Sequence, residues 1–193
     1  MNIGIYIYNN AEVLDFSGPF EVFSVASRFL DKDDKFNVFL LSEKDKTIEA
    51  RGGYKVNAHY TISNHPPLDV LLVVGGVHTE EIKKPQVIQW INQQSKKVKI
   101  ISSVCTGAFL LAESNVVTEH TVTTHWEDIE DLRDQYPLLN VVDNVRWVDE
   151  GNIISSAGIS AGIDMSLYLV SKIKNMKLAE KTAKQMQFDW TKN

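Results

Sequence analysis

The chain has few of the residues that build covalent or repetitive frameworks. Its 193 residues include one cysteine, five prolines and ten glycines. One cysteine excludes an internal disulfide and a cysteine-rich zinc site, and so little glycine and proline excludes a collagen-like or low-complexity chain. The hydrophobic fraction of 44% and the charged fraction of 23% are typical of globular proteins. Such a chain buries roughly 70% of its unfolded surface, so it needs no crosslink to hold a core.

Long apolar runs and an excess of positive charge are also absent. No run approaches the roughly 18 apolar residues of a membrane span, and the N-terminus resembles no signal peptide. The net charge of −5 argues against a protein that coats nucleic acid or anionic membrane. Six lysines between residues 172 and 193 are interpreted as a solvated helix face rather than a nucleic-acid site. We therefore expect a cytoplasmic protein without nucleic-acid or membrane partners.

Short apolar strands alternate with helical patterns along the chain. We expect strands at 3–8, 36–41, 70–74 and 98–104, with strand-like pieces at 47–62, 121–124, 140–142, 145–149 and 152–155. Helices are expected at 18–31, 80–94, 105–113, 161–174 and 176–189. Pro19 fits the first turn of the first helix and Ser17 its N-cap. The alternation predicts one α/β domain over residues 1–193, with a mostly parallel sheet covered by helices on both faces.

Cys105 follows an apolar strand directly and precedes a helix, in the sequence Ser103-Val104-Cys105-Thr106-Gly107. Small residues two before and two after a nucleophile are typical of a nucleophile elbow, because bulky side chains would collide in that sharp turn. The amides and dipole at a helix N-terminus are expected to lower the pKa of the thiol and to bind developing negative charge. A lone cysteine is commonly buried and inert, but this pattern favours a reactive thiol.

A thiol nucleophile needs a partner that handles its proton. Asp15 follows the first strand among apolar residues, and burial there would raise its pKa so that it can donate a proton. The alternative is that Asp15 only caps the first helix, although Ser17 is better placed for that role. Thr106 offers a hydroxyl and an amide beside the sulfur. Both Asp15 and Cys105 follow strands, so both are expected at the same rim of the sheet.

Three further features are candidates for binding substrate. Gly75 and Gly76 end the strand at 70–74, where they either let the backbone approach a ligand or form a plain turn. His125, in Thr123-Thr124-His125-Trp126, either lines the pocket or is structural. The small residues of 156–164 form either a pocket wall or a tightly packed helix start, without the spacing of a dinucleotide site. The other histidines show no metal spacing, so we expect no metal and no cofactor.

Several segments together resemble the ThiJ/PfpI superfamily, which has the class I glutamine-amidotransferase-like fold. They are LDFSGPFEVF, LLVVGG, SSVCTGAFLLAESNVV, TVTTHW and SSAGISAGIDMSLYLV. The resemblance covers nearly the whole chain, and within the superfamily it points to the isonitrile hydratase branch and to the sensor half of AraC-type transcription regulators. It implies a flavodoxin-like three-layer sandwich that forms a homodimer.

The resemblance also implies a reaction. Cys105 matches the elbow nucleophile, and Asp15 matches the acidic partner in the LDxxGPxEVF segment. The thiolate attacks the terminal carbon of an isonitrile, the aspartic acid protonates the adduct, water adds, and an N-substituted formamide leaves. Thr106 would assist at the sulfur, with Gly75 and Gly76 near the bound carbon. Where isonitrile hydratases have a glycine-rich stretch this chain has Ile154-Ser155-Ser156-Ala157, which leaves the substrate open.

Two alternatives to the hydratase stay open. One is a non-enzymatic redox- or ligand-sensing module that uses the same thiol. The other is an amidase or peptidase, against which Thr106 argues, because PfpI-type peptidases carry a histidine at that position. AraC-type regulators need a helix-turn-helix pair after this domain, for which the 193 residues leave no room. We therefore expect a free-standing enzyme that acts on a small-molecule substrate.

Overall fold

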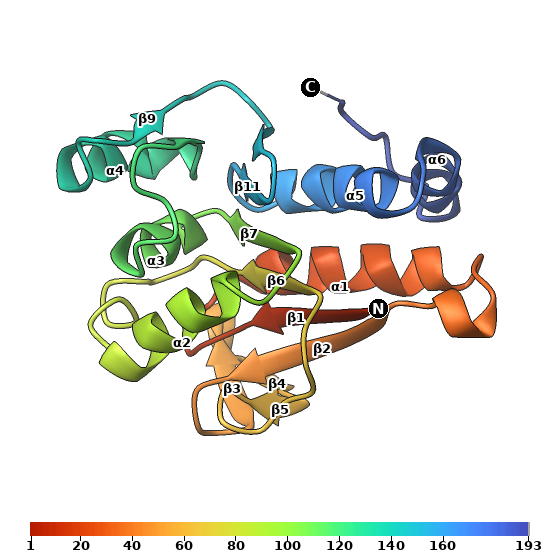
Figure 1. Ribbon diagram of the computed structural model, residues 1–193, viewed down its shortest axis with the longest axis horizontal. Coiled ribbons are helices and arrows are strands. Elements are labelled where there is room, and N and C mark those ends of the chain that lie inside the picture. Colours follow the sequence, from red (N-terminus) through yellow and green to blue (C-terminus); the bar gives the residue numbers. More distant parts are fainter. Residues whose placement is uncertain (193) are drawn as a thin grey trace.

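A seven-stranded sheet forms the centre of the protein in the computed structural model, which describes residues 1–192 (Figure 1). Its strands are β1 (Asn2–Tyr6), β2 (Asn37–Ser42), β5 (Tyr60–Thr61), β6 (Val70–Val73), β7 (Ile100–Val104), β10 (Trp147–Glu150) and β11 (Ile153–Ser156). They lie in the order β10-β11-β7-β6-β1-β2-β5. Every neighbouring pair is parallel except β10 with β11, which is antiparallel. The predicted, mostly parallel sheet is confirmed.

Helices cover both faces of this sheet. On one face α1 (Val13–Ser27) packs against α5 (Ala161–Ile173) and α6 (Met176–Gln185), and on the other lie α2 (Pro85–Ser95) and α3 (Gly107–Glu113) (Figure 1). This is the predicted α/β three-layer sandwich of the flavodoxin-like type. The strands β1, β6 and β7 are apolar throughout because both of their faces are covered. Within residues 1–192, no helix is both long and apolar enough to cross a bilayer.

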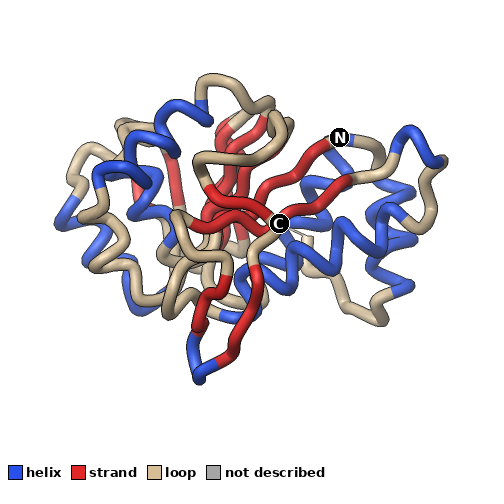
Figure 2. The backbone as a smooth tube through the Cα atoms, turned by 90° about the horizontal axis from the view of Figure 1, so that it is seen from below, coloured by secondary structure: helices blue, strands red, loops and turns tan. Residues whose placement is uncertain are grey.

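Smaller elements flank the sandwich. The antiparallel strands β3 (Thr47–Ala50) and β4 (Tyr54–Asn57) form a hairpin that projects from the body with a short helical tip (Figure 2). The expected strands at 121–124 and 140–142 pair with each other as β8 (Thr121–Val122) and β9 (Asn140–Val141), outside the main sheet, beside α4 (Ile129–Gln135). These elements carry loops that reach the edge of the sheet where β6 and β7 end.

The predicted start of the first helix is wrong. The helix α1 begins at Val13 rather than at 18, so Asp15 lies in its first turn and Pro19 in its interior. The hydroxyl of Ser17 donates to the carbonyl of Val13 at 2.8 Å, as an in-helix contact rather than an N-cap. The helix tolerates Pro19 because the missing N–H removes only the bond to the Asp15 carbonyl, one turn from the start.

Two other helices also begin later than predicted. The helix α2 starts at Pro85 instead of 80, because proline is favoured at the first helical position. The helix α3 starts at Gly107 instead of 105, because Cys105 has a φ of 56°, outside the helical region. Cys105 therefore stands between β7 and α3 and belongs to neither.

Candidate active site

Cys105 occupies a strained turn at the carboxyl end of β7. A positive φ is uncommon outside glycine, and Cys105 has a φ of 56°. A Cβ on Gly107 would lie 2.1 Å from the Val73 carbonyl oxygen, so the position two after the cysteine has no room for a side chain. The backbone of the cysteine is held on both sides, since its N–H donates to Ser156 at 3.2 Å and its carbonyl accepts from the Thr124 hydroxyl at 2.9 Å. The turn has the geometry of a nucleophile elbow.

Asp15 is brought to this turn by the first turn of α1. The side chain is 0% exposed, and its Oδ2 accepts a hydrogen bond of 3.0 Å from the amide of Gly75. Its Oδ1 has no partner of full hydrogen-bond geometry, although the Cys105 thiol and the Ile159 amide lie close enough to lower the carboxyl pKa. Burial outweighs these contacts and raises the pKa of Asp15 to about 7. Two residues 90 positions apart in the sequence thus share one buried site.

The predicted lowering of the thiol pKa is wrong. The pKa of Cys105 is raised, chiefly by burial and next by the charge of Asp15, while the amides of Thr106 and Ile159 act in the opposite direction. The cysteine is only 6% exposed, and desolvation of a thiolate at such a site outweighs the amides of the seven-residue α3. The resting thiol is therefore neutral. A thiolate forms when the proton moves to the neighbouring carboxylate.

Gly75 and Gly76 form more than a plain turn. A Cβ on Gly75 would lie 2.5 Å from the Thr106 backbone nitrogen and 2.8 Å from the Cys105 Cβ. Gly76 has a φ of 134°, and a Cβ there would lie 2.3 Å from the Asn10 carbonyl oxygen. Both glycines are needed for the backbone to approach this closely. They line the side of the site opposite Ile159, next to the carboxyl and the thiol.

The hydroxyl of Thr106 ties the two strand ends together. It accepts a hydrogen bond from the Gly76 amide and donates one to the Gly76 carbonyl, both at 2.9 Å. The hydroxyl is thus occupied by the glycine turn, while the backbone N–H of Thr106 is the group that favours the ionised form of Cys105. The geometry assigns Thr106 a positioning role through its side chain and an electrostatic role through its amide.

His125 lies in the wall of a cavity next to the elbow. The cavity has a volume of about 590 Å³ and is lined by residues from segments 123–130, 143–146 and 157–160. The ring packs so tightly on Gly158 that a Cβ there would lie 1.9 Å from its Nδ1, and its Nε2 lies 3.6 Å from a carboxylate oxygen of Glu127. Among the contacts of residues 1–192, no histidine hydrogen-bonds to Cys105. His125 therefore shapes the cavity rather than pairing with the thiol.

Two residues of the site were missed at the level of sequence. Ile159 has a φ of 53°, an outlier for a β-branched residue, and this conformation directs its amide to Cys105 and Asp15. Tyr8, which follows β1, is 2% exposed, and its hydroxyl has no partner of full geometry. Its pKa is raised by burial and by nearby charges that include Asp15. The small residues of 156–164 and the aromatic end of IGIYIY were the only sequence signals.

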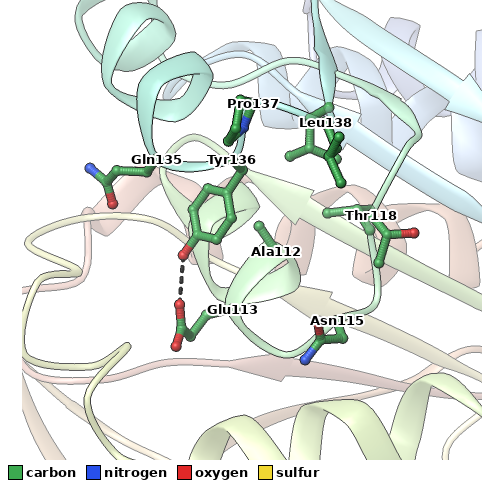
Figure 3. A pocket seen from close by; sticks show the side chains of 10 residues that line it. Ala112, Glu113, Asn115, Thr118, Gln135, Tyr136, Pro137 and Leu138 are labelled. Carbon is green, nitrogen blue, oxygen red and sulfur yellow. Dashed lines mark hydrogen bonds between the residues drawn. The ribbon is translucent and has the colours of Figure 1, made fainter.

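A second cavity lies at the far end of α3 from Cys105. It has a volume of about 390 Å³ and lies between the end of α3 and the loop after α4. Figure 3 shows the Tyr136 hydroxyl pointing to Glu113, to which it donates a hydrogen bond of 2.8 Å. None of the residues selected from the sequence lines this cavity. Within residues 1–192, no three His, Cys, Asp or Glu side chains are grouped to hold a metal ion.

Comparisons with known proteins agree with this arrangement. The isonitrile hydratase of Pseudomonas putida is 26% identical over 189 residues, which cover 97% of this chain and 78% of that protein. The transcriptional regulator CdhR of Pseudomonas aeruginosa is 29% identical over 173 residues, or 90% of this chain and 51% of that protein. The chain thus spans about half the length of this regulator.

Solved structures show the same fold. A ThiJ/PfpI family protein from Pseudomonas syringae superposes with a TM-score of 0.86 at 21% identity, covering 99% of this chain and 76% of that one. DJ-1beta of Drosophila melanogaster superposes with a TM-score of 0.82 at 16% identity, covering 98% of each chain. Residues 1–172 match the DJ-1/PfpI family as a whole. The chain therefore belongs to the DJ-1/PfpI family.

Proposed function

We propose that the protein is an enzyme that hydrates an isonitrile, or a related small electrophilic carbon compound, through Cys105. The observation that carries the proposal is the buried pair of the Cys105 thiol and the Asp15 carboxyl, which has a pKa of about 7. A carboxyl with this pKa can accept a proton and return it near neutral pH. Isonitrile hydration needs both steps at the same carbon.

The reaction balances with these two side chains and one water molecule. The Asp15 carboxylate takes the proton of the Cys105 thiol, and the sulfur bonds to the terminal carbon of R–N≡C. Asp15 then returns the proton to that carbon, which gives a thioimidate, R–N=CH–S. Water adds to the same carbon, the carbon–sulfur bond breaks, and R–NH–CHO leaves as Cys105 regains its proton.

The surrounding backbone supports this chemistry. The amides of Thr106 and Ile159 favour negative charge on the sulfur, and the amide of Gly75 holds the carboxyl in place. The absence of a side chain at Gly75 leaves the approach to the sulfur open. The similarity to an isonitrile hydratase over 97% of the chain supports the same activity.

A ligand-sensing domain is the second candidate. HTH-type regulators are among the relatives, and this chain corresponds to about half of their length. The redox form of this hypothesis is disfavoured because a thiol with a raised pKa is a poor target for oxidation. An amidase or peptidase is disfavoured because the partner of Cys105 is a carboxyl and the residue after it is Thr106. We also infer a cytoplasmic homodimer, which sedimentation velocity would test.

Turnover of cyclohexyl isocyanide by the purified protein tests the enzyme hypothesis. We expect N-cyclohexylformamide to form with the native chain and not with Cys105→Ala. Asp15→Asn, which keeps the shape of the side chain, should lose most of the activity because it cannot carry the proton. A folded native protein that makes no more formamide than the Cys105→Ala control would refute the hydratase and favour the sensor.

A further inference from the structure

Trp126 stands apart from the other buried tryptophans of the protein. Its side chain is 75% exposed, whereas Trp90 and Trp147 are 7% and 6% exposed. It begins the short 3-10 helix Trp126–Asp128, between β8 and α4, and its indole lies 5.9 Å from the His125 ring. A large aromatic side chain left in water is an unusual cost for a protein surface and commonly marks a binding site.

The indole of Trp126 lines the 590 Å³ cavity beside the elbow. The volume is within the range of small-molecule pockets. The apolar lining comes from three separate segments, with Ile129 on α4, Val145 before β10 and Ile159 before α5 joining Trp126. These side chains form an apolar surface around one hollow rather than isolated exposed residues.

The cavity is contiguous with the nucleophile. Ile159, one of its lining residues, directs its amide at Cys105. Thr124, another, donates its hydroxyl to the Cys105 carbonyl at 2.9 Å. A group attached to a carbon atom bound at the sulfur would therefore extend into this hollow.

The charged groups of the lining are engaged within the protein. Arg146 donates to the buried carboxylate of Asp164 and to the Ser160 hydroxyl. Glu130 is paired with Arg133 at 2.6 Å. Neither charge calls for a counter-charge on the ligand, and a charged ligand group would have to compete with these pairs.

We propose that this cavity binds the N-substituent of the substrate, and that the substituent is an uncharged alicyclic or aromatic group packed on Trp126. The proposal rests on the hydratase function and adds its substrate class. Small isonitriles such as methyl isocyanide leave the cavity unfilled, whereas a cyclohexyl group covers the indole and removes apolar surface from water.

The first test measures binding without turnover. In the Cys105→Ala protein, NMR titration compares N-cyclohexylformamide with N-methylformamide. Adding Trp126→Ala should weaken binding of the cyclohexyl compound about tenfold and that of the methyl compound less than about twofold, and Trp126→Phe should restore most of the loss. Leu138→Ala, at a side chain 72% exposed at the other cavity, is the control and should change neither.

The second test measures turnover in the Cys105 protein. Trp126→Ala should lower kcat/KM for cyclohexyl isocyanide about tenfold and leave that for methyl isocyanide within about twofold. Equal effects on both substrates, or no effect on either, would overturn the cavity assignment while the hydratase function stands. Selective binding of the cyclohexyl formamide to a protein that turns over neither isonitrile would refute the hydratase and leave the assigned cavity intact.

Discussion

The amide of Gly75 donates a 3.0 Å hydrogen bond to one carboxyl oxygen of Asp15, and the other oxygen accepts no hydrogen bond of full geometry. The bond joins the end of β6 to the first turn of α1 and turns the carboxyl toward Cys105. It favours the charged carboxylate, but burial has the larger effect, so the pKa is about 7. The protonation state of Asp15 therefore changes near neutral pH, next to the only thiol of the chain.

We expect Cys105 to react slowly with iodoacetamide at pH 7, with a rate that rises only above the usual thiol pKa of about 8.5. Burial and the Asp15 charge both disfavour the thiolate. Asp15→Asn removes the charge, so the pH at which the alkylation rate rises should move down. Mass spectrometry measures the rate, with Cys105→Ala as the blank. The same pH profile for both proteins would show that Asp15 has no electrostatic effect on the thiol.

Asp15→Asn should stabilise the fold at high pH. The carboxyl has a pKa of about 7 in the folded protein and a usual value of 3.8, so the folded state retains a proton that the unfolded chain loses. The stability present below pH 3.8 is lost as the pH rises through about 7. Asparagine does not ionise, and its gain at pH 9 should reach up to about 4 kcal/mol.

Urea denaturation at two pH values checks this expectation. The gain in the free energy of unfolding should be large at pH 9 and much smaller at pH 5, where less of that stability has been lost. Glu21→Gln, at an exposed carboxylate on the same helix, is the control and should give a small change at both values. An Asp15→Asn gain of equal size at pH 5 and pH 9 would contradict the raised pKa.

Local sequence patterns were sufficient for the sheet and the elbow. The apolar runs at 70–74 and 98–104 predicted buried parallel strands, because only a strand covered on both faces is apolar throughout. The small residues around Cys105 predicted the tight turn, and the contact between Gly107 and the Val73 carbonyl shows the steric reason. Each of these features depends on a few neighbouring residues.

Features that depend on tertiary contacts could not be predicted in this way. The thiol pKa is set by burial and by Asp15, 90 positions away, rather than by the start of α3. The start of α1 at Val13 depends on packing against α5 and places Asp15 in the site. The amide of Ile159 reaches Cys105 only because the backbone there adopts a φ of 53°, for which a β-branched side chain gives no signal.

Thr106→Val should destabilise the protein by about 1–3 kcal/mol, because it leaves the Gly76 amide without its acceptor and the Gly76 carbonyl without the Thr106 donor. Valine has nearly the same shape, so packing is little changed. Thr106→Ser keeps the hydroxyl and should restore most of the stability and the formamide production. Urea denaturation and turnover of the two variants give the comparison. Equal stability of the valine and serine variants would show that the hydroxyl does not hold the glycine turn.

Gly75→Ala should impair both folding and catalysis. The added Cβ would lie 2.5 Å from the Thr106 backbone nitrogen and 2.8 Å from the Cys105 Cβ, so the elbow itself must shift. Overpacking of this kind costs about 1–3 kcal/mol, and the shift should lower kcat/KM for cyclohexyl isocyanide about a hundredfold. Gly53→Ala is the control: it has a φ of 76° and open space around its Cβ, so it should cost about 1 kcal/mol in strain and leave turnover unchanged. A Gly75→Ala protein with native turnover would mean that the sulfur is not held by this contact.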